Sequence, residues 1–375
     1  MKTLNSFLLI ALLAFVNWGC QEPEITAPPS APKVDPKTKN VIFLIGDGMG
    51  LTQVSTAFYF SGGVPNFSKF RQISLINTSS RSHKITDSAA GATAFACGKR
   101  TYNGAIGMDA DTQSINNITE ILAKRNIRSG LVSTSSITHA TPACFFAHAD
   151  SRRKEEFIAS QMSDSEVDFF AGGGSHFFNK RKDGANYIDT LKNRGFEISL
   201  GPIQAPENWD INKKYGFLAD TLAMPSMLKG RGDFLPEATQ MALDYLSQDT
   251  NGFFLMVEGS QIDWGGHANN SDYIITEVED FDKTIGVALE FAIRNQNTLV
   301  IVTADHETGG YALSSRRDTI DGKVRSNYDE IAPTFSTGGH TASLIPVFAY
   351  GPGETDFNGI YNNHEIYQKM LRALQ

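Results

Sequence analysis

Two carboxylates and an imidazole follow one apolar run at a spacing suited to metal binding. The run is residues 253–257, and Glu258, Asp263 and His267 come after it. A short, continuous apolar run is typical of a buried parallel strand, and open α/β sheets bind ligands beyond the carboxyl ends of their strands. Carboxylate oxygen and imidazole nitrogen are zinc ligands. The segment therefore suggests a metal site, although one such cluster is about as often a solvated polar loop.

Acids and histidines also lie beside other apolar runs. Asp47 follows residues 41–45, Asp305 and His306 follow residues 299–303, and His340 precedes the last apolar run. One acid at one strand end is most often a loop residue or a helix cap. Several such groups along one edge of one sheet are harder to explain without a ligand, and metal coordination is the simplest chemistry that needs this mixture.

Apolar runs alternate with helical patterns along most of the chain. The expected helices and further strands are, in chain order, 115–125, 129–133, 167–171, 237–246, 273–293, 345–350 and 365–374. This alternation predicts an α/β fold, with a mostly parallel central sheet sandwiched by helices in a single large domain. The more polar and irregular stretch 177–227 is interpreted as an insertion or surface region.

Length and charge narrow the classes of function. The chain has 375 residues, enough for a well-buried core. Its formal net charge is −8 and it has no long basic run, which argues against nucleic acid as the main partner. No stretch of the expected mature chain is long and apolar enough to span a bilayer.

The N-terminus has the features of an export signal. Residues 1–19 combine a positive start with an apolar stretch and end in a small residue before Cys20, which resembles a lipoprotein signal with Cys20 lipidated. Plain cleavage is the alternative. Residues 20–39 are interpreted as a flexible tether and residues 40–375 as the folded domain. The expected location is the periplasm or the outer membrane or surface of a bacterium.

Two cysteines remain within the expected domain. Cys97 and Cys144 could pair in an oxidising compartment, but two cysteines do not form a disulfide framework. We expect buried free thiols.

Ser88 lies in a segment of small residues, 86–94, that is suited to a closely packed helix. Ser88 would then sit near the N-terminus of this helix, where free N–H groups and the helix dipole favour an anion. The alternative is that Asp87 or Ser88 serves only as an N-cap.

These segments together resemble the alkaline phosphatase family. The matching motifs, in order, are GDGMG at 46–50, TDSAA at 86–90, Glu258 with Asp263 and His267, TADH at 303–306 and GHT at 339–341. The matches span residues 40 to 355. The resemblance implies an alkaline phosphatase-like fold that hydrolyses phosphate monoesters through a phosphoserine intermediate.

The resemblance also assigns ligands to two zinc ions and one magnesium ion. The first zinc site comprises Asp263, His267 and His340. The second comprises Asp47, Asp305 and His306, with Ser88 as the nucleophile beside it. The magnesium site comprises Asp47, Thr141 and Glu258. Arg152 matches the arginine that clamps phosphate in the family. Arg153 and Lys154 follow it directly, and the spacing from Thr141 favours Arg152.

Two positions depart from the best-known bacterial form. His139 replaces an aspartate near the magnesium site, which implies either hydrogen bonding to the metal ligands or weak metal binding. Trp264 replaces a lysine that reaches phosphate through water, which implies weaker phosphate binding.

Other interpretations remain open. A phosphodiesterase or sulfatase of the same superfamily fold is the first alternative, and an inactive surface lipoprotein that binds metal or phosphate is the second. The family resemblance is also compatible with a homodimer.

Overall fold

The computed structural model describes residues 38–375. The predicted signal peptide, the predicted lipidation site Cys20 and nearly all of the predicted tether lie outside these residues. Thr38 and Lys39, at the end of the predicted tether, already contact the domain: Thr38 Oγ1 donates to the carbonyl of Pro352, and the Lys39 amide donates to the carbonyl of Asn297.

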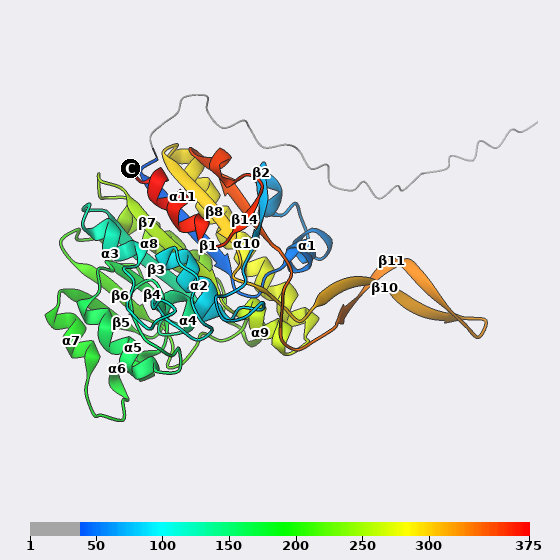
Figure 1. Ribbon diagram of the computed structural model, residues 1–375, viewed down its shortest axis with the longest axis horizontal. Coiled ribbons are helices and arrows are strands. Elements are labelled where there is room, and N and C mark those ends of the chain that lie inside the picture. The colour runs from blue at the N-terminus through cyan, green and yellow to red at the C-terminus, as the bar shows by residue number, and fades with distance from the viewer. Residues whose placement is uncertain (1–37) are drawn as a thin grey trace, which may run out of the picture.

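A ten-stranded sheet runs through the described part of the chain, in the order β14-β2-β13-β8-β1-β7-β3-β4-β6-β5 (Figure 1). Its strands are β1 Asn40–Gly46, β2 Gln72–Asn77, β3 Arg128–Ser136, β4 Phe169–Gly173, β5 Phe196–Leu200, β6 Lys214–Leu218, β7 Phe253–Gly259, β8 Thr298–Thr303, β13 Ile345–Tyr350 and β14 Ile360–Asn362. Only β13 runs antiparallel to its neighbours in this sheet. The predicted α/β fold with a mostly parallel sheet is confirmed.

Helices cover both faces of this sheet. They are α1 Leu51–Tyr59, α2 Ser88–Cys97, α3 Ile118–Ala123, α4 Ala140–Ala143, α5 Glu155–Gln161, α6 Ser175–Asn179, α7 Tyr187–Asn193, α8 Phe234–Leu246, α9 Gln261–His267, α10 Ser271–Arg294 and α11 Glu365–Ala373. β7 is buried along its whole length and contacts α8 and α10 as well as α4. Because a strand buried on both faces needs a cover on each, these helices must belong to two layers.

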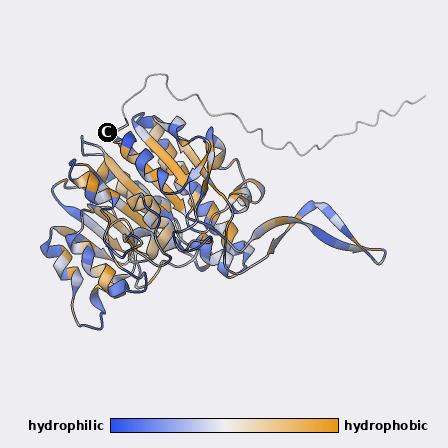
Figure 2. Cartoon of the chain, viewed as in Figure 1, coloured by the Kyte–Doolittle hydropathy of each residue, from blue (hydrophilic) through white to orange (hydrophobic). Residues whose placement is uncertain are grey.

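The central strands form the core because their sequences are continuous apolar runs. Residues 41–45 in β1, 253–257 in β7 and 299–302 in β8 are all fully buried. These strands are the most hydrophobic part of the fold, whereas the outer helices carry hydrophilic residues on their surfaces (Figure 2). The continuous apolar pattern is what the two covered faces require.

Two smaller pairings complete the fold. β10 Tyr311–Ile320 and β11 Lys323–Phe335 form a long antiparallel hairpin that projects from the body as an arm (Figure 1). β9 Glu307–Thr308 pairs with β12 His340–Thr341 near the base of this arm.

The predicted insertion at 177–227 is wrong in part. This stretch contains α7 and also β5 and β6, which extend the main sheet at one edge. β5 is mostly exposed, so it lacks the continuous apolar run that marks an inner strand. The strand expected at 167–171 is observed two residues later, at 169–173. The helix expected at 115–125 is observed at 118–123, and it begins there because Asn117 forms a capping box with Glu120.

No helix in the described residues is long and apolar enough to cross a membrane. Cys97 and Cys144 are both buried free thiols, as predicted. Burial raises the pKa of the Cys144 thiol to about 12, which keeps it protonated and unreactive at neutral pH.

Candidate metal and nucleophile site

Three neighbouring strands bring carboxylates to one edge of the sheet. β1 lies between β7 and β8, and Ile45 pairs with Glu258 on one side and with Thr303 on the other. Asp47 and Asp305 each come two residues beyond this level, so both lie just past Glu258 at the same edge of the sheet. All three carboxylates are fully buried, so the parallel register alone assembles an acidic cluster far from bulk water.

A short helix, α9, follows β7, where a solvated polar loop was one interpretation of the sequence. Asp263 and His267 lie one turn apart on α9, so both face the same way, and His267 Nε2 lies 3.4 Å from Asp263 Oδ2. The helix packs tightly against the β1 end. A Cβ on Gly48 would lie 2.6 Å from Asp263 Cα, and Gly48 has a φ of +74°, so only glycine fits there.

His340 joins α9 from a distant part of the chain. Its Nε2 lies 3.2 Å from His267 Nε2 and 3.6 Å from Asp263 Oδ1. His340 Nδ1 is 2.9 Å from the carbonyl of Thr86, and His267 Nδ1 is 2.7 Å from the carbonyl of Gly338. Each Nδ1 therefore donates to a carbonyl, so in the neutral tautomers the two Nε2 atoms that face each other are both acceptors.

A second group surrounds His306. Its Nε2 lies 3.2 Å from Asp305 Oδ2 and 3.5 Å from Asp47 Oδ1, and all three side chains are fully buried. The rings of His306 and His340 stack with centroids 3.5 Å apart. The two groups are thus adjacent, as a two-metal site would require.

Ser88 is the first residue of α2 and points into this cluster. Its Oγ lies 3.3 Å from His306 Nε2 and 3.5 Å from Asp47 Oδ1. The side chain of Asp87 accepts from the Ala90 amide, so Asp87 is the N-cap and Ser88 is not needed for capping. The hydroxyl of Ser88 is therefore available for chemistry at a buried helix N-terminus.

Arg152 faces the cluster from the side of Asp87. Its Nη1 donates to Asp87 Oδ2 at 3.1 Å, and its Nη2 lies 3.2 Å from His139 Nε2. His139 Nε2 accepts from Arg152, because the guanidinium is a donor only. Burial, and next the Arg152 charge, lower the pKa of His139 to about 3. His139 is therefore neutral at physiological pH.

A third group comprises Asp47, His139 and Glu258, whose ligand atoms lie within 4.8 Å of one another. Glu258 Oε2 accepts from Ser133 at 2.6 Å and from Ser260 at 2.7 Å. These bonds occupy Oε2, whereas Oε1 has no hydrogen-bond partner among the described residues. His139 also lies edge-to-face with Trp264, at a centroid separation of 6.1 Å.

The cluster has the donor atoms that metal ions need. Within residues 38–375, several buried atoms of this cluster have no hydrogen-bond partner: Asp47 Oδ2, His139 Nδ1, Thr141 Oγ1, Glu258 Oε1 and Asp305 Oδ2. Unpaired buried polar atoms are costly. Carboxylate oxygens and neutral imidazoles that converge in this way fit divalent cations, which would pair them.

Electrostatics support the same interpretation. Burial, and next the neighbouring carboxylates, raise the pKa of Asp47 well above its ordinary value, and burial with Asp263 raises the pKa of Asp305 to about 6. Burial also lowers the pKa of His306 to about 3. These shifts are those of a site whose charges need a cation.

Comparison with known proteins identifies the family. The alkaline phosphatase family model matches residues 38–330. The chain belongs to the alkaline phosphatase family. It is 32% identical to alkaline phosphatase 3 of Bacillus subtilis over 100% of this chain and 97% of the relative, and 29% identical to the alkaline phosphatase of Escherichia coli over 91% and 87%.

Solved structures agree with this family. The alkaline phosphatase of the Antarctic bacterium TAB5 superposes with a TM-score of 0.88 at 53% identity, over 91% of this chain and 99% of that chain. A histidine-to-aspartate mutant of the TAB5 enzyme, described with Mg bound in the M3 site, superposes with a TM-score of 0.89. The fold and the phosphatase class predicted from the motifs are confirmed.

Several residues that support this phosphatase site were not singled out from sequence. Thr308 Oγ1 donates to Asp263 Oδ1 at 2.5 Å and lies 3.2 Å from His306 Nδ1. Ser133 lies on β3, next to the strand that carries Glu258, and no local sequence pattern indicated its bond to Glu258. Asp87 was considered only as a cap, yet it also holds Arg152.

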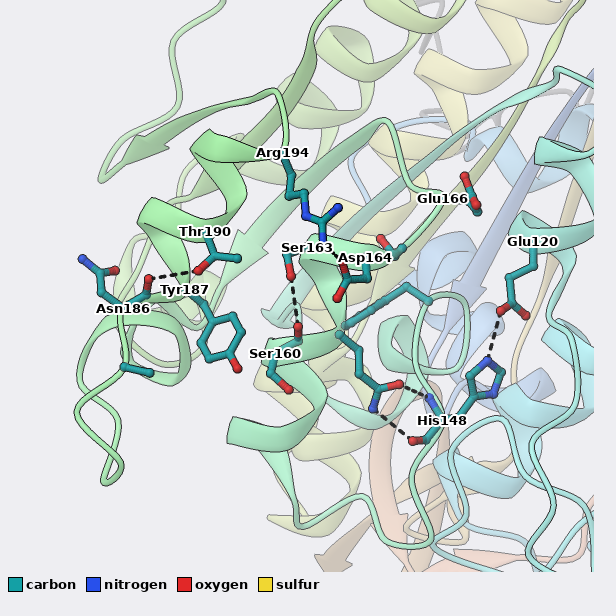
Figure 3. Close-up of a pocket in the computed structure, with 14 residues that line it drawn as sticks. Glu120, His148, Ser160, Ser163, Asp164, Glu166, Asn186, Tyr187, Thr190 and Arg194 are labelled. Atoms are coloured by element: carbon teal, nitrogen blue, oxygen red, sulfur yellow. Dashed lines mark hydrogen bonds and ion pairs between the residues drawn. The ribbon is translucent and has the colours of Figure 1, made fainter.

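The histidines outside the phosphatase site have separate surroundings. His148 lines a pocket of about 620 Å³ between α5, α7 and Glu120 (Figure 3). Its Nδ1 lies 2.9 Å from the carbonyl of Gly107, and its Nε2 lies 3.3 Å from Glu120 Oε1. The hydrogen bond to Glu120 raises the pKa of His148. The pocket shares no residue with the metal-ligand groups.

Proposed function

We propose that this phosphatase hydrolyses phosphate monoesters through a phosphoserine intermediate on Ser88. The supporting observation is that Ser88 Oγ lies 3.3 Å from His306 Nε2 and 3.5 Å from Asp47 Oδ1, at the N-terminus of α2. Ser88 attacks phosphorus, its Oγ–P bond forms as the bond to the leaving alcohol breaks, and water then releases inorganic phosphate from Ser88.

We propose two zinc sites, one with Asp263, His267 and His340 and the other with Asp47, Asp305 and His306. When bound, zinc lowers the pKa of hydroxyl groups and water and neutralises phosphate charge. The buried carboxylates and neutral imidazoles supply the mixed oxygen and nitrogen donors that zinc prefers. Removing metal with a chelator should abolish activity, and zinc should restore it.

Arg152 is proposed to clamp the phosphate. Its bonds to Asp87 and His139 fix the guanidinium plane and leave further N–H groups for two nonbridging phosphate oxygens. A doubly charged terminal phosphate gains more from this clamp than a diester does. The clamp therefore favours phosphomonoesterase activity over the phosphodiesterase or sulfatase alternative.

Rates on a phosphate monoester, a diester and a sulfate ester test this proposal, with Ser88→Ala as the matched variant. The monoester should be the preferred substrate by orders of magnitude, and Ser88→Ala should form no acid-stable phosphoenzyme. Equal turnover by Ser88→Ala would contradict the nucleophile assignment, and a preference for the diester or the sulfate would contradict the substrate class.

We propose that the third site takes magnesium through Asp47, Thr141 and Glu258. The buried, unpaired Thr141 Oγ1 and Glu258 Oε1 support this assignment, since magnesium prefers oxygen ligands. His139 belongs to the same group of potential ligands, and a ring nitrogen as donor would make this site more tolerant of zinc than oxygen donors alone. Added magnesium should raise the activity of the zinc-loaded enzyme, and full activity in zinc alone would contradict this.

We also propose export, with a lipid anchor at Cys20, and a homodimer. The signal-like residues 1–19 support export. Large exposed apolar side chains on α1 and on the projecting arm support self-association, among them Leu51, Tyr59, Val324 and Tyr328. Mass spectrometry of the mature N-terminus and sedimentation of the purified domain test these two proposals.

A further inference from the structure

We infer that Glu307 is a positioning residue that sets the separation of the two histidines assigned to different zinc sites. Glu307 follows His306 in the chain, and its carboxylate bonds to Thr341, which follows His340. This inference rests on the proposed function in taking His306 and His340 as zinc ligands. It adds a residue that touches neither substrate nor metal.

The carboxylate of Glu307 is buried and fully engaged. Its Oε1 accepts from Gln53 Nε2 at 2.8 Å and from the Tyr311 amide at 3.1 Å. Its Oε2 accepts from the Gly310 amide at 3.3 Å and from the hydroxyl of Thr341. Each oxygen already has two donors, so Glu307 is saturated and is not itself a metal ligand.

The donors come from three separate parts of the chain. Gln53 lies on α1, Gly310 and Tyr311 lie at the base of the arm, and Thr341 lies on β12. Gln53 Nε2 also donates to the carbonyl of Thr308, at 2.9 Å. The Glu307 side chain thus ties the arm, α1 and β12 to the strand that follows His306.

These side-chain hydrogen bonds of Glu307 are important because few backbone pairs join β9 and β12. β9 and β12 form only two residue pairs, His340 with Thr308 and Thr341 with Glu307. Residues 309–339, including the whole arm, lie between them, so closing this loop costs conformational entropy. The rings of His306 and His340 nonetheless stack at 3.5 Å. Besides this stacking, the bond from Thr341 to Glu307 is a side-chain hydrogen bond that joins the two histidine segments directly.

The fold makes room for Glu307 at Gly50. A Cβ on Gly50 would lie 2.4 Å from Glu307 Cγ, although Gly50 has an ordinary φ of −76°. Gly50, the last glycine of the GDGMG motif, is therefore needed because a larger side chain would collide with Glu307. Its backbone conformation would allow other residues. This gives one glycine of that motif a role in seating the carboxylate.

Zinc release from the holoenzyme to a colorimetric chelator tests the inference without relying on turnover. Thr341→Val removes the hydroxyl at nearly constant volume, Thr341→Ser retains it, and Thr334→Val removes a hydroxyl on β11 that bonds to Ser314 instead. We expect Thr341→Val to release zinc roughly 10-fold faster, in keeping with the effect of residues that orient metal ligands. Thr341→Ser and Thr334→Val should release it at the wild-type rate.

Glu307→Gln and the double variant separate this bond from other contacts of Thr341, which also bonds to Ser343. A glutamine amide has one accepting oxygen for the four donors that face Glu307, so Glu307→Gln weakens the bonding that Thr341→Val also weakens, and the effects of the two changes on zinc release should be less than additive. Wild-type release from both single variants, or fully additive effects, would overturn the inference. The wild-type protein could also bind zinc but hydrolyse no phosphate monoester. Faster zinc release from the variants would then still support the role of Glu307, while the proposed function would be contradicted.

Discussion

His267 Nε2 and His340 Nε2 lie 3.2 Å apart, while the Nδ1 atom of each imidazole is bonded to a backbone carbonyl. Two facing, unprotonated nitrogens cannot hydrogen-bond to each other. A cation between or beside them removes this conflict. The carbonyls of Gly338 and Thr86 therefore fix the tautomers that metal binding needs, before any metal arrives.

Replacement of His340 should remove one metal. We expect His340→Ala to lose about one zinc per chain and to lower kcat/KM by at least ~100-fold, because Asp263 and His267 alone leave an incomplete site. Elemental analysis after gel filtration measures the metal, and monoester hydrolysis measures activity. His83→Ala is the control, since His83 is exposed and lies outside the metal-ligand groups. A full zinc complement in His340→Ala would contradict the assignment.

Arg152→Lys should weaken phosphate binding more than it slows turnover. Lysine keeps the positive charge but cannot offer two parallel N–H bonds, and it loses the fork that spans Asp87 and His139. We expect KM for a phosphate monoester and Ki for inorganic phosphate to rise by roughly 10-fold. Arg153→Lys is the matched control. An unchanged Ki for Arg152→Lys together with a raised Ki for Arg153→Lys would assign phosphate binding to Arg153 instead of Arg152.

Asp305→Asn should stabilise the metal-free protein at alkaline pH while abolishing activity. Burial raises the pKa of folded Asp305 to about 6 from an ordinary 3.8. The wild type therefore loses stability as pH rises from about 4 through about 6, because the unfolded chain ionises more easily. With chelator present, we expect the variant to be more stable by roughly 1–3 kcal/mol at pH 8.

The advantage of Asp305→Asn should vanish near pH 4, where most of the wild-type carboxyl is protonated in the folded state and about half in the unfolded state. The carbonyl oxygen of the substituted side chain can keep the bonds from the amides of Gly48 and His306 that Asp305 Oδ1 accepts now. Thermal unfolding at both pH values measures the difference. Parallel pH profiles for the two proteins would show that the buried charge of Asp305 is not a source of instability.

Gly48→Ala should displace α9 and with it Asp263. The new Cβ would lie 2.6 Å from Asp263 Cα, at a φ of +74° that alanine rarely adopts. We expect a loss of roughly 1–3 kcal/mol in stability and a fall in zinc affinity. Gly63→Ala is the control because nothing lies within 4 Å of its added Cβ. Equal melting temperatures and zinc affinities for the two variants would contradict this account.

The sequence by itself determined the fold class and the identity of the chemical groups. Continuous apolar runs at 41–45, 253–257 and 299–302 require strands covered on both faces, and a parallel sheet then places Asp47, Glu258 and Asp305 at one edge. Asp87 and Ser88 also had the local pattern of a helix start, and the structure places the cap on Asp87.

Only the tertiary structure decided how these groups meet. The seating of Glu307 against Gly50, the bond between Thr308 and Asp263, and the stacking of His306 on His340 join residues that are distant in sequence or lack a local signal. The arm and the edge strand β5 were also missed, because exposed strands carry mixed polar residues and no apolar run. Local patterns report burial and backbone preference, whereas contacts across the sheet edge depend on how the elements pack.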